Sequence, residues 1–344
     1  MRFFSCCELD KHVPGDTRIP AKFDDERYWR PSVPRASFFM RRMLRRPTMN
    51  PALYGDAELT TGQCDVLASC VRSAQRDFPD RGLLFLYGIM PRSGTNFLYR
   101  LLLRNPAFSA PQIAFAELPV LAGEAYFAEP MELFGRIHQP SADAFGRMEW
   151  MAYALAGFRN RLLDLAPADS LTLVKNPLLY GVDLSPIFFP DDRILMIERD
   201  ARYICDSFRR SFARRRLSRT FEDICLETSL AMEKALRLRE SMDDALLLAV
   251  KYEDLMADKA VIVGRIADWL GRPDIRLASS DAGDVPIYGS SVYSPRAADG
   301  AVDWAPVKPP EGFNPAARPL DWNAAELRTF ERVCGPVNRR MGYA

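Results

Sequence analysis

A short loop between two apolar segments holds the residues of this chain whose types and spacing best suit chemistry. Residues 83–106 read LLFLYGIMPRSGTNFLYRLLLRNP. The apolar run at 83–87 predicts a buried strand, and residues 95–103 predict a helix. A loop of this kind points several backbone N–H groups at one spot, where the partial positive charge of the helix N-terminus favours an anion. The stretch therefore predicts a phosphate-binding loop.

The side chains of this loop suit an anion that is held without a metal. Gly88 and Gly94 permit close approach of the backbone, and Arg92 lies nearest the outer end of a bound phosphate chain. Loops that bind ATP or GTP follow G-x-x-x-x-G-K-[ST], in which the final hydroxyl holds Mg²⁺. Here Thr95 stands where the lysine would be, and the span between the glycines is one residue longer. A metal-free anion therefore fits better than Mg-ATP.

Strands and helices that must position this loop alternate along the chain. Strands are predicted at 83–87, 171–174, 193–197 and 246–250, and helices at 95–103, 201–212, 221–242 and 258–270. A last helix is predicted from Asn323 to about Arg340, since Asn323 and Glu326 have the three-residue spacing of a capping box. Strands interleaved with helices imply a mostly parallel sheet with helices on both faces, whose ligands bind at the carboxyl ends of the strands. We expect an α/β, P-loop-type three-layer fold.

Three segments fall outside this alternation. Residues 1–80 are expected to form an N-terminal extension that packs on a domain at 81–344. Within that domain, 118–170 reads as a helical insertion and 272–322 as a Pro-rich loop at the acceptor or nucleotide, because long loops in compact domains are usually functional.

Composition limits the partners. The chain has 344 residues and a formal net charge of +1, so nucleic acid is not expected as a partner and any anion site must be local. No apolar run is long enough to span a bilayer, and the start lacks an apolar core of signal-peptide length, so we expect a cytoplasmic protein. Residues 34–47, PRASFFMRRMLRRP, could touch a membrane surface, although a helix packed on the domain explains them more simply.

Cysteine and histidine usage argues against a metal centre. The cysteines are odd in number and include no C-x-x-C pair, which favours reduced, mostly buried thiols over a disulfide frame or a zinc site. The two histidines, His12 and His138, exclude a multi-histidine site. The seven cysteines are Cys6, Cys7, Cys64, Cys70, Cys205, Cys225 and Cys334.

The loop PRSGTNFLYRLL resembles the 5′-phosphosulfate loop of sulfotransferases, which use 3′-phosphoadenosine-5′-phosphosulfate (PAPS) and release PAP. It is similar to the PRSGT form of carbohydrate and tyrosylprotein sulfotransferases rather than to the PKSGT form of cytosolic small-molecule enzymes. The resemblance implies that the loop and helix start bind the co-substrate. The residues concerned are Arg92, Ser93, Gly94, Thr95, Asn96 and Phe97.

A second stretch, ILMIERDARYICDSF, extends the resemblance. In this family a strand delivers an Arg and, eight positions later, a Ser, and the two hold the 3′-phosphate; here they are Arg199 and Ser207. A guanidinium binds phosphate bidentately, and a hydroxyl two turns along can close the other side. The simpler alternatives are an ion pair between Arg199 and Asp200 at the strand end and an ordinary helix-face hydroxyl.

Two further stretches match the family. A strand that ends in Tyr-Glu-Asp-Leu places a Tyr near the nucleotide, which implies that role for Tyr252, with a core tyrosine as the alternative. In the Pro-rich segment, IYGSSVYSPR offers Ser290 and Ser291 where similar enzymes have a nucleotide-contacting Ser; a simple turn explains them equally well.

Sulfuryl transfer needs an in-line acceptor hydroxyl, a base and cations for the departing phosphate. Arg92 is the expected stabiliser of the bridging oxygen. Glu117, beyond the post-loop helix, resembles the Glu base of tyrosylprotein and heparan-type enzymes, with Glu124 and His138 as alternatives. Lys175, in a Lys-Asn-Pro stretch without the His of cytosolic enzymes, resembles a lysine near the leaving group; a solvated strand-end lysine is the alternative.

Together these features predict a sulfotransferase that moves a sulfuryl group from PAPS to an acceptor hydroxyl without a metal. The acceptor is expected to be carbohydrate-like, although a lipid, a peptide tyrosine or a metabolite would leave the same motifs. A P-loop kinase that uses Mg-ATP and a non-catalytic nucleotide-binding protein remain as alternatives. The basic run at 209–219, RRSFARRRLSR, could attract PAPS or an acidic acceptor, or could form a solvated helix face.

Overall fold

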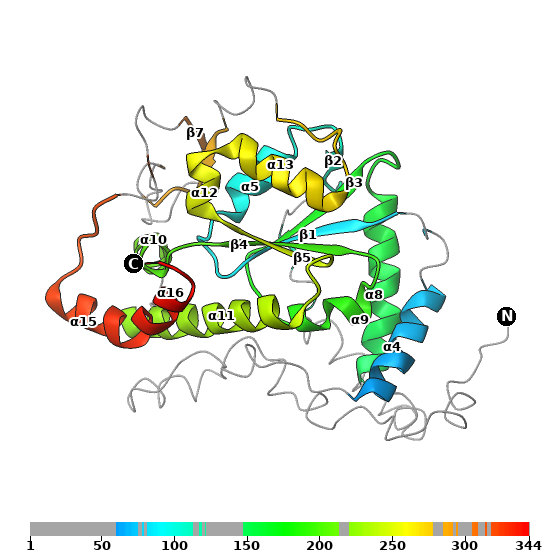
Figure 1. Cartoon of the computed structure of the whole chain (residues 1–344), viewed down its shortest axis with the longest axis horizontal. Coiled ribbons are helices and arrows are strands. Elements are labelled where there is room, and N and C mark those ends of the chain that lie inside the picture. The colour runs from blue at the N-terminus through cyan, green and yellow to red at the C-terminus, as the bar shows by residue number, and fades with distance from the viewer. Residues whose placement is uncertain are drawn as a thin grey trace.

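A parallel sheet forms the centre of the fold in the computed structural model (Figure 1). The residues described are 60–74, 78, 81–112, 117–118, 121, 147–212, 220–277, 285–291, 294, 305–308, 314 and 318–343. The strands of the sheet are β1 (Leu83–Gly88), β2 (Phe108–Ser109), β3 (Leu171–Asn176), β4 (Arg193–Glu198) and β5 (Leu247–Lys251). Their order is β2-β3-β1-β4-β5, and every neighbouring pair is parallel. The predicted α/β class is confirmed.

Helices cover both faces of this sheet. They are α4 (Thr61–Ala74), α5 (Thr95–Leu102), α8 (Arg147–Asp164), α9 (Ser185–Phe188), α10 (Ala201–Phe212), α11 (Phe221–Ser241), α12 (Tyr252–Ala257), α13 (Lys259–Leu270), α15 (Ala324–Val333) and α16 (Gly335–Arg340). In Figure 1, α5, α12 and α13 lie on one side of the sheet, and α8, α9 and α11 lie on the other. Side chains of β1 alternate between the two cores, as strand geometry requires. Leu84 and Leu86 pack with the α5–α13 core, whereas Phe85 and Tyr87 pack with the α8–α11 core.

The predicted alternation of strands and helices is confirmed. All four predicted strands are present, with ends that lie within two residues of the expected ones. The helix expected from residue 258 begins at Lys259, because Asp258 is its N-cap and accepts a hydrogen bond from the Val261 amide. The short β2 was not predicted. The Pro-rich segment, expected to be irregular, contains an antiparallel pair, β6 (Ile287–Tyr288) and β7 (Pro306–Val307).

The single closing helix that the sequence predicted is in fact two helices. The capping box of Asn323 and Glu326 is present, so α15 begins where expected. The chain then breaks at Cys334, and α16 starts at Gly335 with Pro336 in its first turn. Proline has no N–H to donate and its ring clashes with the carbonyl of the preceding turn, so α15 cannot continue through it.

The segments outside the alternation are described only in part. Leu67 and Val71 of α4 are buried in the same core as α8, and α8 lies inside the expected insertion at 118–170. Residues 34–47 lie outside the described residues. The division into an extension and a domain therefore stays a prediction. Among the described helices, none has the length and apolar character that a membrane span requires.

Three cysteines that are far apart in the sequence meet in the core. Cys205 on α10, Cys225 on α11 and Cys334 between α15 and α16 are buried, and their sulfur atoms lie within 4.8 Å of one another. The expectation of buried free thiols is met for these residues. The spacing of these cysteines in the sequence did not indicate that they would meet. That the reaction proceeds without a metal stays a prediction.

Candidate active site

The loop between β1 and α5 has the tight geometry that its glycines predict. Gly94 is the N-cap of α5 and has a φ of 104°, in the left-handed region. A Cβ atom at Gly94 would lie 2.3 Å from Cδ2 of Tyr252, and one at Gly88 would lie 2.7 Å from Cγ2 of Thr95. Both positions therefore exclude a side chain, and the loop backbone lies directly against its neighbours.

Ser93 shapes this loop from the inside. Its hydroxyl donates to the Met90 carbonyl over 2.6 Å and accepts from the Met90 amide over 3.1 Å, and the residue is fully buried. The hydroxyl of Ser93 is hydrogen-bonded within the loop, and the predicted contact of this residue with the co-substrate stays a prediction. The amides at the start of α5 are the groups predicted to bind an anion, because the first N–H groups of a helix lack the usual partner within it.

Arg92 connects the loop to the opposite end of the site. Its Nε donates to the hydroxyl of Ser207 over 2.9 Å, and its Nη2 donates to the Gly289 carbonyl over 2.6 Å. Within the described part of the chain, Arg92 is the one residue other than glycine with a positive φ, at 84°. Such backbone strain clusters at functional sites.

Arg199 lies at the end of β4, where the sequence placed it. Its Nη1 donates to the Arg92 carbonyl over 3.0 Å, and its guanidinium lies 4.4 Å from the ring centre of Tyr252. Burial lowers the pKa of this guanidinium from its usual value, and the aromatic and acidic neighbours oppose that shift. Asp200 is hydrogen-bonded to Arg202 and Asn338. The carboxylate of Asp200 is thus paired with Arg202, and no ion pair between Asp200 and Arg199 is observed among the described residues.

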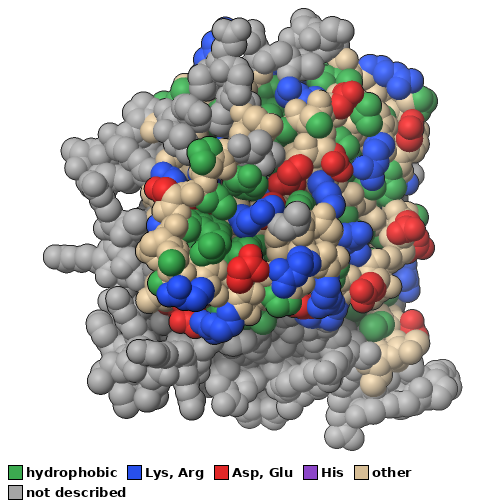
Figure 2. All heavy atoms as spheres, turned by 60° about the vertical axis from the view of Figure 1, so that its left-hand side comes forward, with side chains coloured by type: hydrophobic (Ala, Val, Ile, Leu, Met, Phe, Trp, Pro, Cys, Tyr) green, Lys and Arg blue, Asp and Glu red, His purple; other side chains and the backbone are tan. Residues whose placement is uncertain are grey.

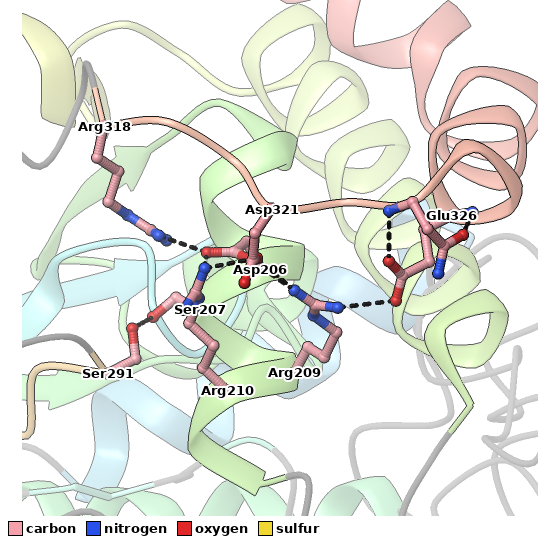
Figure 3. Close-up of polar contacts among 9 residues, drawn as sticks. Asp206, Ser207, Arg209, Arg210, Ser291, Arg318, Asp321 and Glu326 are labelled. Carbon is pink, nitrogen blue, oxygen red and sulfur yellow. Dashed lines mark hydrogen bonds and ion pairs between the residues drawn. The ribbon is translucent and has the colours of Figure 1, made fainter.

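Ser207 and Ser291 meet beside Arg92. Their hydroxyl oxygens are 3.1 Å apart and both residues are buried, although one belongs to α10 and the other to the Pro-rich segment (Figure 3). Ser290 differs, because its amide donates to the Ser294 hydroxyl over 2.7 Å in a local turn. Of the two serines that the sequence offered, Ser291 is the one in contact with Ser207.

Tyr252 links the two halves of the site. It packs against Gly94 on one side and Arg199 on the other, and Phe97 meets its ring edge-on with centroids 6.4 Å apart. Burial raises the pKa of the Tyr252 phenol, so the hydroxyl stays protonated at neutral pH. Tyr252 is buried in the core beside α5, as the alternative of a core tyrosine predicted, and its contact with the nucleotide stays a prediction.

Lys175 and Glu117 form the other half of the site. Lys175 Nζ lies 3.0 Å from Glu117 Oε1, and it also contacts the Asn96 side chain at the start of α5. A backbone hydrogen bond of 2.9 Å from the Leu118 amide to the Lys175 carbonyl fixes Glu117 beside β3. Lys175 is buried, whereas Glu117 is 33% exposed. Burial lowers the pKa of Lys175, and the carboxylate of Glu117 opposes that shift. Lys175 is thus not a solvated lysine.

Sequence reasoning missed Arg318. This residue follows the Pro-rich segment and forms an ion pair with the buried Asp206 of α10 (Figure 3). Arg209 and Arg210, the first members of the basic run, bind Asp206 and Asp321. These two arginines are therefore paired rather than simply solvated. Neither a motif nor a periodicity distinguishes Arg318 from the other arginines in the sequence.

Several expected features cannot be placed. Glu124 and His138, the alternative bases, and residues 213–219 of the basic run lie outside the described residues. On the face shown in Figure 2, Lys and Arg side chains are mixed with Asp and Glu among the described residues. The mixture of charges on this face agrees with the net charge of +1.

Comparison with known proteins identifies the class. The model of the Sulfotransferase family matches residues 84–276, which is more than half of the chain. The chain therefore belongs to the sulfotransferase family, whose members are PAPS-dependent enzymes. This agrees with the predicted class and disfavours the ATP-using kinase. No curated protein matches the sequence.

Several solved structures are similar to this chain. A sulfotransferase domain from the curacin biosynthetic pathway is 13% identical, with coverage of 77% of this chain and 98% of that one and a TM-score of 0.43. Mouse SULT7A1 complexed with PAP is 15% identical, with coverage of 79% of this chain and 89% of that one and a TM-score of 0.42. The sulfotransferase STF1 from Mycobacterium tuberculosis H37Rv is 18% identical, with coverage of 75% of this chain and 82% of that one and a TM-score of 0.37.

Proposed function

We propose that this sulfotransferase moves the sulfuryl group of PAPS to a hydroxyl of a carbohydrate-like acceptor, with Glu117 as the base. Lys175 and Arg92 stabilise the departing phosphate, and Arg199 and Ser207 bind the 3′-phosphate. A cytoplasmic location and a reaction without a metal remain predictions of the sequence.

The position of Lys175 carries this proposal. Its ammonium group contacts both Glu117 and Asn96, and Asn96 is the second residue of the helix whose N-terminus binds an anion. A cation, a carboxylate and a phosphate-binding helix start therefore meet at one point. These are the groups that sulfuryl transfer requires at its reacting centre.

The reaction is an in-line displacement at sulfur. The acceptor oxygen forms a bond to sulfur as the bond from sulfur to the bridging oxygen of PAPS breaks. The acceptor proton passes to the carboxylate of Glu117, which is exposed enough to meet an acceptor. The negative charge that develops on the former bridging oxygen, which becomes part of the 5′-phosphate of PAP, is stabilised by the ammonium of Lys175. The guanidinium of Arg92 binds Ser207 and the Gly289 carbonyl in the structure, so its contribution requires that it turn toward the 5′-phosphate when PAPS binds.

The 3′-phosphate assignment is supported on the other side of the loop. Arg199 and Ser207 both bind Arg92, one through its carbonyl and the other through its side chain. A serine hydroxyl can accept one hydrogen bond and still donate another, so Ser207 can bind Arg92 and a phosphate oxygen together. Ser291, at 3.1 Å, supplies a second hydroxyl there.

The acceptor class rests on the resemblance of the PRSGT loop and the Glu base to carbohydrate-type enzymes. The test is transfer of radiolabelled sulfate from PAPS, in the presence of EDTA, to an oligosaccharide, a tyrosine peptide and a sterol. We expect labelled oligosaccharide with wild-type protein and none with Glu117→Gln. Label confined to the peptide or the sterol would contradict the acceptor class, and transfer by Glu117→Gln would remove Glu117 as the base.

A further inference from the structure

Three thiols from separate segments of the chain form a cluster in the core. Cys205 lies on α10, Cys225 on α11 and Cys334 between α15 and α16, and all three residues are fully buried. Helix α11 packs against both α10 and α16 (Figure 1). The three sulfur atoms lie within 4.8 Å of one another. Since bonded sulfur atoms are about 2 Å apart, two of these atoms need to approach by less than about 3 Å to form a disulfide.

Cys205 is the member of this cluster whose thiol ionises most readily. Burial alone would raise the pKa of Cys205, but hydrogen bonds from the neighbouring thiols, Cys225 first among them, outweigh that effect and hold the pKa below its ordinary value. The contact with Cys205 in turn raises the pKa of Cys225. The Cys334 sulfur also donates to the Cys225 carbonyl over 3.0 Å. Because thiolates react with oxidants and thiols do not, Cys205 is the expected nucleophile, with Cys225 as its partner.

The cluster is connected to both elements that are proposed to bind phosphates. Cys205 precedes Ser207 by two residues on α10. The Thr228 hydroxyl lies 3.5 Å from the Cys205 sulfur and 2.9 Å from the Met90 sulfur. Met90 belongs to the phosphate-binding loop, and its amide and carbonyl hold the hydroxyl of Ser93. A displacement of Cys205 is therefore expected to disturb α10 and the loop together.

A metal ion held by all three sulfur atoms would suit the cluster less well than a disulfide. Metal binding requires ionised thiols, and a thiol that is ionised can no longer donate a hydrogen bond to Cys205. The charges of Asp200 and Glu222 oppose ionisation of Cys205 and Cys225, respectively. Buried charge without a partner is costly, whereas a disulfide is neutral.

We propose that Cys205 and Cys225 form a disulfide when the protein is oxidised by hydrogen peroxide, and that this bond weakens the binding of PAPS. The inference rests on the proposed function, which places the 3′-phosphate at Ser207, in the same turn of α10 as Cys205. The bond would draw α10 toward α11 and remove the Cys205 sulfur from Thr228.

The oxidation takes two steps. The thiolate of Cys205 attacks one oxygen of hydrogen peroxide, the O–O bond breaks, and the departing hydroxide takes up a proton to leave as water. The resulting sulfenic acid is attacked by the sulfur of Cys225, the S–S bond forms, and the sulfenic oxygen leaves as a second water with the Cys225 proton. Two thiols thus lose two electrons, and one peroxide gains them.

Peroxide reaches the cluster through a local opening of the structure. Cys334 lies at the break between α15 and α16, and α16 has only six residues. A helix this short has little stability of its own and depends on its packing against α11. Local openings of such elements require less free energy than global unfolding. Separation of α16 from α11 is therefore the expected route for a small oxidant.

The test measures the PAP affinity of the full chain before and after treatment with hydrogen peroxide, which catalase then removes. Peptide mapping without reductant identifies the disulfide. We expect a bond between Cys205 and Cys225, a loss of PAP affinity of roughly five- to 150-fold, the usual range for coupling between two sites, and recovery with dithiothreitol. Cys205→Ala and Cys225→Ala should each keep their affinity through the treatment. Cys334→Ala, in the same cluster, and Cys64→Ala, on α4, are the controls and should lose affinity as the wild type does.

Thermodynamic linkage supplies an independent measurement. If the disulfide weakens PAP binding by a given factor, bound PAP must oppose the disulfide by the same factor. In mixtures of reduced and oxidised glutathione, the bond should therefore need a more oxidising ratio to form when PAP is present. ADP, which lacks the 3′-phosphate, should shift the ratio less.

Three results would overturn the inference. They are the absence of the Cys205–Cys225 bond after oxidation, a bond that leaves PAP affinity unchanged, and a loss of affinity in peroxide-treated Cys205→Ala or Cys225→Ala. Either variant decides the last point if the other does not fold. Failure of the proposed function would look different, because the reduced wild-type protein would then show no preference for PAP over ADP.

Discussion

Arg92 Nε donates a hydrogen bond to Ser207 Oγ over 2.9 Å, although 115 residues separate the two positions in the chain. Arg92 belongs to the phosphate-binding loop after β1, and Ser207 belongs to the helix after β4. The groups proposed for the two ends of PAPS are therefore directly connected. Any change that displaces Ser207 is also expected to disturb the loop.

Replacement of Arg199 by alanine should weaken the binding of nucleotides that carry a 3′-phosphate and leave the binding of other nucleotides almost unchanged. Arg199 is the buried cation at the carboxyl end of β4, so its loss should weaken PAP on the order of 100-fold, as expected when a charge-assisted, bidentate contact to phosphate is removed. Affinity for ADP should change little. Calorimetric titration measures both, with Arg340→Ala, an exposed arginine paired with Glu233, as the control. Equal losses for PAP and ADP would refute the role.

Glu117→Gln should retain nucleotide affinity and lose turnover. The amide keeps the shape of the side chain but cannot take the acceptor proton, and general-base catalysis typically contributes about 100- to 10,000-fold. The measurement is the rate of PAP release with a saturating acceptor, together with PAP affinity. Glu222→Gln, at an exposed ion pair, is the control. Turnover close to wild type would show that another group is the base.

Lys175 should set an alkaline limit on activity. Burial lowers its pKa, so the ammonium loses its charge at a lower pH than a free lysine does. The charged form is the one that stabilises the leaving phosphate, and turnover should therefore fall as pH rises through this lowered pKa. Arginine keeps its charge at these pH values, so Lys175→Arg should remove the alkaline decline even if its maximal rate is lower. An identical decline in both proteins would assign it to another group.

The loop backbone should not tolerate a side chain at Gly94. Alanine there would have a strained positive φ and a Cβ 2.3 Å from Tyr252, so we expect a loss of about 2 kcal/mol or more in the free energy of unfolding. Gly157→Ala is the matched control, because no atom lies within 4 Å of the added Cβ in the middle of α8. In that variant the free energy of unfolding should rise by about 0.5–1 kcal/mol. Denaturant unfolding compares the two, and similar effects would contradict the loop geometry.

The sequence predicted the sheet well because its strands are short apolar runs between polar residues. Both faces of β1 are buried, so the run at 83–88 is apolar throughout and easily recognised. The break at Pro336 was missed because the apolar periodicity continues past Cys334. The two-residue strands β2, β6 and β7 are too short to show any periodicity.

For the site, spacing along one strand and helix was informative, whereas contacts between distant segments were not. Arg199 and Ser207 are close in sequence, and a motif could select them. Arg318 contacts α10 only because the chain returns there after the Pro-rich segment. Its ion-pair partner, Asp206, is distant in sequence, so no local motif reveals the pair. The inward orientation of Ser93 depends on the loop backbone, which residue types alone do not determine.

The most direct test of 3′-phosphate recognition is calorimetric titration of the wild-type protein with PAP and ADP, each with and without EDTA, and with Mg-ATP. We expect a strong preference for PAP that EDTA does not change, because Arg199, Ser207 and the loop are proposed to bind the phosphates without a metal. Preference for Mg-ATP, or no discrimination between PAP and ADP, would contradict it.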